Sequence, residues 1–311
     1  MMRPWISFST RSFLKEAFNL KHYSLFDLLH GYIYARWPYL YIGVGTGEHH
    51  LAKTYLYFSQ LWKRLSGNNT QPTKSSLQPD RPTIADGYHG KVVPFESASR
   101  LVTVKQEISL KNLEQIIPYS RARDIILKHP DHIVALDCPC RASRPNPCLP
   151  LDVCLVVGEP FASFVSEHHP QRSRWISQDE AVEILSKERE RGHVHHAFFK
   201  DAMLGRFYAI CNCCSCCCGA MRAHADGTPM LASSGFISTL DEALCIGCGD
   251  CIDACQFFAL TTIDGAAYVD QDNCMGCGVC VSHCLQGALS LKKAPSRGEP
   301  LDIQELISRL N

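Results

Sequence analysis

The sequence predicts an α+β protein with several parts, and three observations predict this class. Residues 1–65 are aromatic and basic and have the character of helices. Residues 91–235 combine apolar strand-like runs with helical patterns, and residues 236–293 hold short β-prone runs around closely spaced cysteines. Residues 66–90 are rich in Ser, Asn, Pro and Gly, so we expect a linker there, and residues 294–311 are expected to form a C-terminal tail.

Within the central part, we expect a strand over Leu101–Ile108, followed by a helical stretch to Lys128. A second strand, Ile133–Leu136, leads directly toward a cysteine. The run Ser177-Gln178-Asp179-Glu180 is a capping box, and the helix after it should end near Gly192. In the C-terminal part the expected strands are Phe236–Thr239, Phe257–Ile263, Ala266–Val269 and Ala288–Leu291.

The C-terminal part contains two cysteine runs with the same spacing, C-x-x-C-x-x-C-x-x-x-C. The first is Cys245, Cys248, Cys251 and Cys255, and the second is Cys274, Cys277, Cys280 and Cys284. Three thiolates at two-residue gaps can bind three corners of a cubane, while the fourth lies one turn further along and points toward the other cluster. We therefore expect one [4Fe–4S] cluster on Cys245, Cys248, Cys251 and Cys284, and another on Cys274, Cys277, Cys280 and Cys255. Zinc knuckles are the alternative, but this spacing suits cubanes better than tetrahedral ions.

These motifs resemble the bacterial two-cluster ferredoxin domain over residues 236–293. The resemblance implies a ferredoxin-like fold and electron transfer. In one departure, Gln256 and Leu285 replace the proline that usually follows the fourth cysteine of each run. This substitution loosens the turn but removes no ligand.

Ten further cysteines precede this domain and form a second cysteine-rich module. Cys138 and Cys140 flank a proline, and Cys148 and Cys154 could complete a set of four, with Arg141 and Arg144 offsetting the negative charge. The other six are Cys211, Cys213, Cys214, Cys216, Cys217 and Cys218. No single backbone conformation directs all six at one centre, so we expect two centres. A helix or loop could direct Cys211 and Cys214 one way, and Cys213 and Cys216 another.

We therefore expect one or two further iron–sulfur clusters upstream, with ligands from both segments. His193, His195 and His196 could replace a thiolate, although a hydrogen-bonded or surface role is the alternative for each. The module together with the C-terminal domain, roughly residues 110–293, resembles uncharacterised multi-cluster 4Fe–4S proteins of anaerobic microbes. That resemblance implies electron transfer in anaerobic metabolism and leaves residues 1–65 unexplained.

Composition indicates the surroundings and partners of the chain. Adjacent and closely spaced cysteines favour thiolate ligation in a reducing cytoplasm over disulfides. We expect no export signal and no membrane span, because charged residues interrupt the most apolar stretch, Tyr23–Val44. Asp241 to Gly287 contains seven acidic residues and no Lys or Arg, whereas residues 1–75 contain nine Lys and Arg against three acidic residues. This favours a redox partner with a basic docking face and, for residues 1–65, contact with a complex or a membrane surface. We expect no nucleic-acid partner.

Three functions fit these patterns. The first is an electron-transfer protein or oxidoreductase subunit that passes single electrons from a low-potential donor to a larger oxidoreductase. The second is a reductase whose catalytic centre is an unusual cluster at Cys211–Cys218. The third is a thiol-rich metal carrier or sensor that binds zinc or Cu(I) upstream. The sequence supplies no evident acid–base pair or substrate pocket, so the first function is preferred over a stand-alone enzyme.

Overall fold

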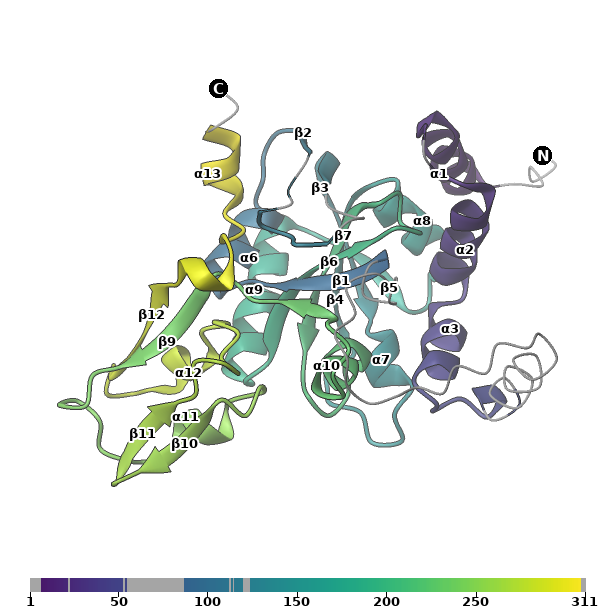
Figure 1. Cartoon of the computed structure of the whole chain (residues 1–311). Coiled ribbons are helices and arrows are strands. Elements are labelled where there is room, and N and C mark those ends of the chain that lie inside the picture. The colour runs from purple at the N-terminus through teal and green to yellow at the C-terminus, as the bar shows by residue number, and fades with distance from the viewer. Residues whose placement is uncertain are drawn as a thin grey trace, which may run out of the picture.

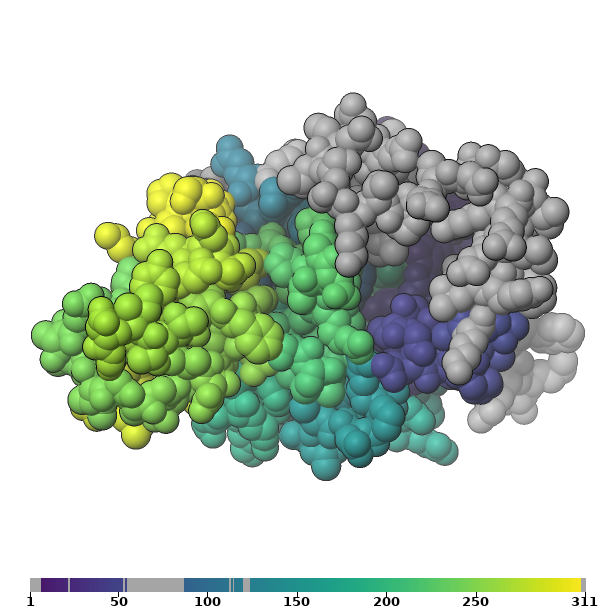
Figure 2. All heavy atoms as spheres, turned by 60° about the horizontal axis from the view of Figure 1, so that its bottom comes forward, coloured from purple at the N-terminus to yellow at the C-terminus, as the bar shows by residue number. Residues whose placement is uncertain are grey.

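The chain folds around one central β-sheet, with helices against both faces and a separate lobe at the C-terminal side. The computed structural model describes residues 7–21, 23–52, 54, 87–111, 113, 115–119 and 124–308. Figure 1 shows the N-terminal helices as a column on one side of the sheet and the C-terminal lobe on the opposite side. Figure 2, viewed from below, shows the same order, with the lobe and the N-terminal helices at opposite ends of the molecule.

The N-terminal region is helical where it is described, as the sequence predicts. It contains α1 (Phe8–Asn19), α2 (Leu25–Arg36) and α3 (Pro38–Gly45). Local capping explains where these helices begin. Ser7 accepts a hydrogen bond at the start of α1, Ser24 forms a capping box with Asp27, and a proline opens α3. Residues 55–65 of the predicted region lie outside the described residues.

Eight strands form the central sheet in the order β2-β3-β4-β7-β6-β1-β8, with β5 paired to β3. All neighbouring pairs are antiparallel except β1 and β8. The strands are β1 (Tyr88–Val92), β2 (Ile108–Leu110), β3 (Ile125–Asp137), β4 (Asp152–Glu159), β5 (Ser173–Ile176), β6 (Val194–Lys200), β7 (Arg206–Cys213) and β8 (Leu231–Ala232). Strand β3 ends next to Cys138, so the strand predicted at Ile133–Leu136 is confirmed.

Two apolar cores lie on opposite faces of this sheet. One face packs against α6 (Phe95–Val102), α9 (Gln178–Glu190) and α13 (Ile303–Ser308). The other packs against α1, α2 and α8 (Phe161–His168), and beside it lie the short helices α7 (Pro139–Ala142) and α10 (Gly219–Ala225). Because the central strands β4, β6 and β7 are buried on both faces, this part of the sheet is a rigid frame that presents side chains at fixed positions.

Two sequence predictions for the central part are wrong. Leu101 and Val102 end helix α6 and do not begin a strand, because Ala98, Leu101 and Val102 share one buried helical face. The helical stretch predicted to continue to Lys128 does not reach that residue, since Ile125 and Leu127 belong to β3 and pair with β2. By contrast, α9 begins where Ser177 accepts a hydrogen bond from Glu180 N and ends two residues before Gly192, as predicted.

The C-terminal lobe consists of two small hairpin-like sheets and two short helices. Its elements are β9 (Phe236–Leu240), α11 (Asp250–Asp253), β10 (Leu260–Ile263), β11 (Ala266–Val269), α12 (Val279–His283) and β12 (Leu289–Lys293). β10 pairs with β11 through the Asp264-Gly265 turn, and β12 pairs with β9. Both turn residues have positive φ, the conformation that tight hairpins require. The four predicted strands are therefore present, although β10 begins at Leu260, three residues later than predicted.

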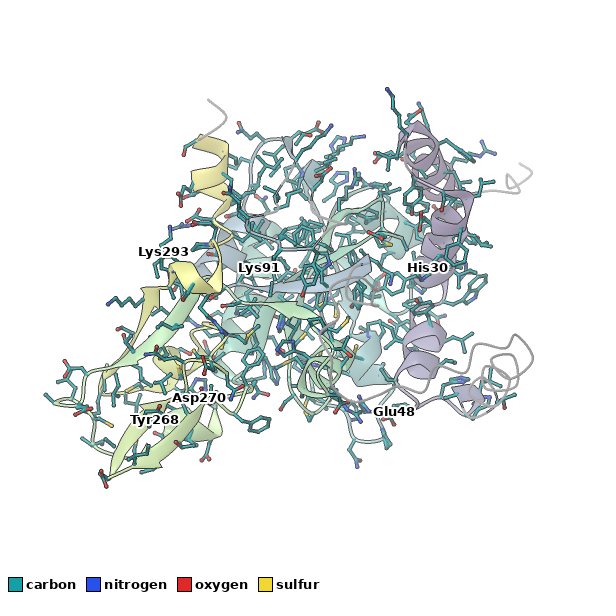
Figure 3. All side chains as sticks on the ribbon, viewed as in Figure 1. His30, Glu48, Lys91, Tyr268, Asp270 and Lys293 are labelled. Atoms are coloured by element: carbon teal, nitrogen blue, oxygen red, sulfur yellow. The ribbon has the colours of Figure 1, made fainter. Side chains whose placement is uncertain are left out.

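The two segments expected to be linker and tail contribute to the fold. Strand β1 begins at Tyr88, inside the segment assigned to the linker, while residues 66–86 lie outside the described residues. After the 3-10 turn η1 (Pro295–Arg297), the C-terminal segment buries Leu301, Ile303 and Leu306 against the sheet. Lys91, at the centre of Figure 3, donates a 2.9 Å hydrogen bond to the Glu299 carbonyl and ties this segment to β1. Within the described residues, no helix is long and apolar enough to cross a membrane.

Candidate iron–sulfur and metal centres

The C-terminal lobe contains two cavities, each lined by four cysteines. The outer cavity, beside the β10–β11 hairpin, is lined by Cys245, Cys248, Cys251 and Cys284. The inner cavity is lined by Cys255, Cys274, Cys277 and Cys280. In both cavities the fourth cysteine comes from the other run, so the structure brings together the two crossed sets that the spacing predicts.

Glycines and backbone amides shape these cavities. A Cβ atom at Gly276 would lie 2.1 Å from the Phe236 carbonyl oxygen, and the residue has φ +64°, so only glycine fits there. Backbone amides of Ser238 and Ala259 donate to Cys274 Sγ at 3.4 Å and to Cys255 Sγ at 3.3 Å. Amide hydrogen bonds of this kind stabilise negative charge on cluster ligands and tune reduction potential.

The ten upstream cysteines fall into two sets. The larger set, here called the six-thiol set, surrounds a cavity of about 70 Å³ between the sheet and the N-terminal helices. Its members are Cys138 after β3, Cys140 in α7, Cys154 on β4, Cys211 and Cys213 on β7, and Cys218 before α10. The smaller set, here called the four-thiol set, consists of Cys148, Cys214, Cys216 and Cys217. Cys214 and Cys217 also contribute to the wall of the cavity, so the two sets adjoin.

This division differs from the grouping expected from sequence. Cys148 does not join Cys138, Cys140 and Cys154, because its Sγ lies 3.3 Å from Cys216 Sγ in the other set. Cys211 and Cys213 are not separated either. Both lie on strand β7 at alternate positions, so they point to the same face of the sheet. After β7 the chain turns, which directs Cys214, Cys216 and Cys217 elsewhere before Cys218 returns to the cavity.

Four members of the six-thiol set are buried, Cys140 and Cys211 are partly buried, and the thiols influence one another. The neighbouring Cys140 thiol raises the pKa of Cys138 to about 12, and burial acts in the same direction. The Cys138 and Cys211 thiols, together with burial, raise the pKa of Cys154 well above its ordinary value. A group of buried thiols that resist ionisation individually is stabilised as thiolates when a cationic metal centre binds between them.

Two arginines supply positive charge beside the thiols. Arg141 is 1 % exposed and forms a 2.5 Å ion pair with Glu188, and it also donates to the carbonyl oxygens of Pro150 and Asn212. Its guanidinium interacts electrostatically with Cys138 of one set and Cys214 of the other. Arg144 donates to the Cys217 carbonyl at 3.1 Å and pairs with Glu48, which is labelled in Figure 3.

Three tyrosines, Tyr34, Tyr88 and Tyr208, line the same cavity, and no sequence pattern marked them as functional. Tyr34 from α2 and Tyr208 from β7 join through a 2.8 Å hydroxyl–hydroxyl hydrogen bond. The Lys200 ammonium lies 4.4 Å from the ring centroids of both Tyr34 and Tyr88. Burial lowers the pKa of Lys200 to about 8. No local pattern could reveal this group, since Tyr34 and Tyr208 are 174 positions apart.

The three histidines of β6 and its entrance belong to neither cysteine set. His193 Nδ1 lies 2.7 Å from the Glu188 carboxylate, and His195 Nδ1 lies 2.6 Å from the Asn212 side-chain oxygen. His196 pairs across the strands with Cys211, and burial lowers its pKa to about 3, so its ring is neutral. Two of the three therefore have the hydrogen-bonding role that was the alternative to ligation.

The lobe contacts the body at several points, for example where His283 Nε2 lies 3.2 Å from the Glu190 carbonyl oxygen, and one contact reaches the four-thiol set. The Gln256 side-chain oxygen accepts hydrogen bonds from Ser215 N at 2.9 Å and from Ser215 Oγ at 3.0 Å. Gln256 follows Cys255 of the inner cavity, and Ser215 lies in the turn that carries the four-thiol set. The residue that replaces the usual proline thus connects the inner cavity to the upstream module.

Comparison with protein families supports the assignment of the lobe. Residues 244–288 match the family described as 4Fe-4S dicluster domain. Comparison with curated proteins gives no match to the chain. The C-terminal lobe is therefore a 4Fe–4S ferredoxin-type domain, attached to a mixed helix-and-sheet body rich in free cysteines.

Proposed function

We propose that the chain is an iron–sulfur electron-transfer protein that carries electrons between a partner and the buried six-thiol cavity. Two [4Fe–4S] clusters would be held by the outer and inner cysteine sets of the lobe, and a further iron–sulfur cluster by the six-thiol set. The observation that carries this proposal is the contact between Gln256 and Ser215. This contact joins the residue after Cys255 to the turn of the four-thiol set, which supports an electron path between the lobe and the body.

The protein residues have distinct roles in this scheme. The clusters supply one-electron storage when bound. The cysteines bind them, the amides of Ser238 and Ala259 stabilise their ligands, and the apolar core excludes water from the six-thiol cavity. Arg141 offsets charge between the two upstream sets.

The surface around the outer set supports docking of a redox partner with a basic face. Leu244, Ile246 and Leu285 are exposed apolar side chains next to outer-set cysteines. Exposed carboxylates, including those of Asp241, Glu242 and Asp250, lie close in sequence to Leu244 and Ile246. An apolar centre with a charged rim is a common interface arrangement, and the carboxylates would steer a basic partner toward the cluster.

The N-terminal helices offer a second contact surface. Phe8, Phe18, Leu25 and Phe26 are exposed on α1 and α2, each more than half accessible to solvent. His30, labelled in Figure 3, lies on the same helical column. We propose that this surface contacts a larger oxidoreductase, and vesicle flotation of the purified protein would test the membrane alternative.

Iron and sulfide analysis of anaerobically purified full-length protein tests the proposed function. We expect about twelve irons per chain, from two clusters in the lobe and one upstream. Cys154→Ala should lower the iron content toward about eight. If the wild type holds about eight irons and Cys154→Ala leaves that number unchanged, the upstream cluster is not present.

One observation favours a second function, reduction of a substrate at the six-thiol centre. The set has two thiols more than a single cubane needs, and the Tyr34–Tyr208 hydroxyl pair lies in the cavity wall near Cys211 and Cys140. Burial raises the pKa values of both tyrosines, so their hydroxyls stay protonated and can donate hydrogen bonds. An open iron would change its electron paramagnetic resonance spectrum on adding carbon monoxide, whereas a fully ligated transfer cluster would not.

A further inference from the structure

The four-thiol set has the dimensions of a site for one metal ion. All of its Sγ atoms lie within 4.8 Å of one another. The separations are 3.3 Å for Cys148–Cys216 and for Cys214–Cys216, 3.6 Å for Cys216–Cys217 and 3.7 Å for Cys148–Cys214. Four thiolates placed tetrahedrally at about 2.3 Å from a zinc ion are separated from one another by about 3.8 Å. The observed spacing therefore matches a tetrahedral ion.

The same spacing is too small for a cubane. Thiolates on the four irons of a cubane are separated by roughly 6 Å, because a different iron binds each one. The two cysteine sets of the lobe serve as a comparison within the same chain, because their sequence motif is the one typical of cubane ligands. Among the described residues, no other group of three or more cysteines has all of its Sγ atoms within 4.8 Å. The lobe sets and the six-thiol set are thus more open, and the four-thiol set differs from them in kind.

We propose that Cys148, Cys214, Cys216 and Cys217 bind one Zn²⁺ ion as a tetrathiolate site, separate from every iron–sulfur cluster. Four protein thiolates fill the tetrahedral coordination of zinc and leave no position for water, which is the arrangement of structural zinc sites. Arg144, bonded to the Cys217 carbonyl, and Arg141, near Cys214, offset the negative charge that four thiolates leave on the complex.

The ion would stabilise a part of the chain with little regular structure. Cys148 lies in the loop between α7 and β4, and the other three ligands lie in the turn between β7 and α10. The pairing of β4 with β7 brings this loop and this turn near each other, and the ion would bind them together beyond the ends of the two strands. The same turn contains Ser215, which binds Gln256 of the lobe. Zinc would therefore fix the turn against which the lobe packs.

Metal analysis of cysteine variants, made in the full-length chain and purified anaerobically, tests this proposal. Wild-type protein should contain about one zinc per chain in addition to its iron. Cys148→Ala should lose this zinc and keep its iron, while the matched control Cys154→Ala, from the adjoining six-thiol set, should lose iron and keep its zinc. Loss of about four irons from Cys148→Ala without any change in zinc would show a cubane and overturn the proposal.

A measurement on wild-type protein keeps the test valid if a variant fails to fold. X-ray absorption at the zinc edge should show four sulfur neighbours at about 2.3 Å and no nitrogen or oxygen. Any mixed coordination, a single iron in place of zinc, or a Cys148–Cys216 disulfide found by mass spectrometry would overturn the proposal. The zinc measurements test the four-thiol site, whereas the iron content tests the proposed electron-transfer function, so failure of one proposal can be distinguished from failure of the other.

Discussion

The crossed ligand sets of the lobe predict an unusual result for double variants. Cys255 lies 19 residues before Cys274 in the sequence, yet it lines the inner cavity together with Cys274, Cys277 and Cys280. Cys255→Ala should therefore remove the inner cluster and leave the outer cluster, although its three nearest cysteine neighbours in sequence belong to the outer one. The variant also removes the sulfur that accepts from Ala259 N, a loss of about 1 kcal/mol in folding free energy.

Iron analysis of pairs of substitutions measures this directly. Cys255→Ala and Cys277→Ala each remove one ligand of the same cluster, so the double variant should lose only about four irons, like either single variant. Cys255→Ala with Cys248→Ala affects two clusters, so that double variant should lose about eight. The reverse pattern, with the first pair additive and the second not, would refute the crossed arrangement.

Three further predictions concern charge, the contact between lobe and body, and burial. Asp250→Asn with Asp253→Asn should slow electron exchange with a basic partner severalfold at low salt, while the control Asp179→Asn on α9 should not. Equal rates for wild type and the double variant at all salt concentrations would exclude electrostatic steering. Gln256→Ala should destabilise the packing of the four-thiol turn against the lobe by about 1–3 kcal/mol, because two hydrogen bonds to Ser215 are lost. Hydrogen–deuterium exchange at the Ser215 amide should become faster without loss of iron. The control Gln271→Ala, at an exposed position, should change neither. Burial lowers the pKa of Lys91 to about 8, so between about pH 8 and 10 the unfolded chain holds a proton that the folded chain has released. The thermal stability of wild type relative to Lys91→Met should therefore rise with pH in this window. A difference in stability that stays constant with pH would contradict the lowered pKa.

The ferredoxin-type domain could be predicted from sequence because its determinants are local. All eight of its cysteines lie between Cys245 and Cys284, and the Asp264-Gly265 turn marks its hairpin. The N-terminal helices and α9 could be predicted as well, since caps at Ser24 and Ser177 mark their starts. In each case a short segment contains both the signal and the structure it determines.

The upstream grouping could not be predicted because it depends on strand register. Cys154 and Cys211 are neighbours only because β4 pairs with β7, a pairing of segments far apart in the chain. Strand β7 is buried on both faces, so its sequence lacks the alternation of apolar and polar residues that would have shown Cys211 and Cys213 on one face. Cys148 lies in a loop whose position is determined by contacts such as that of Arg144 with the Cys217 carbonyl.

The residues that follow the fourth cysteines distinguish the inner set, which faces the body, from the outer set, which faces solvent. A proline after Cys255 would have no side-chain oxygen to accept from Ser215, so the departure from the usual motif adds this contact with the four-thiol turn. The corresponding residue in the other run, Leu285, is 88 % exposed beside the outer set. The two residues thus have opposite surroundings, since Gln256 contacts the thiol-rich turn and Leu285 faces solvent. Electron exchange with a partner should therefore occur at the outer set, and exchange with the six-thiol cavity at the inner set.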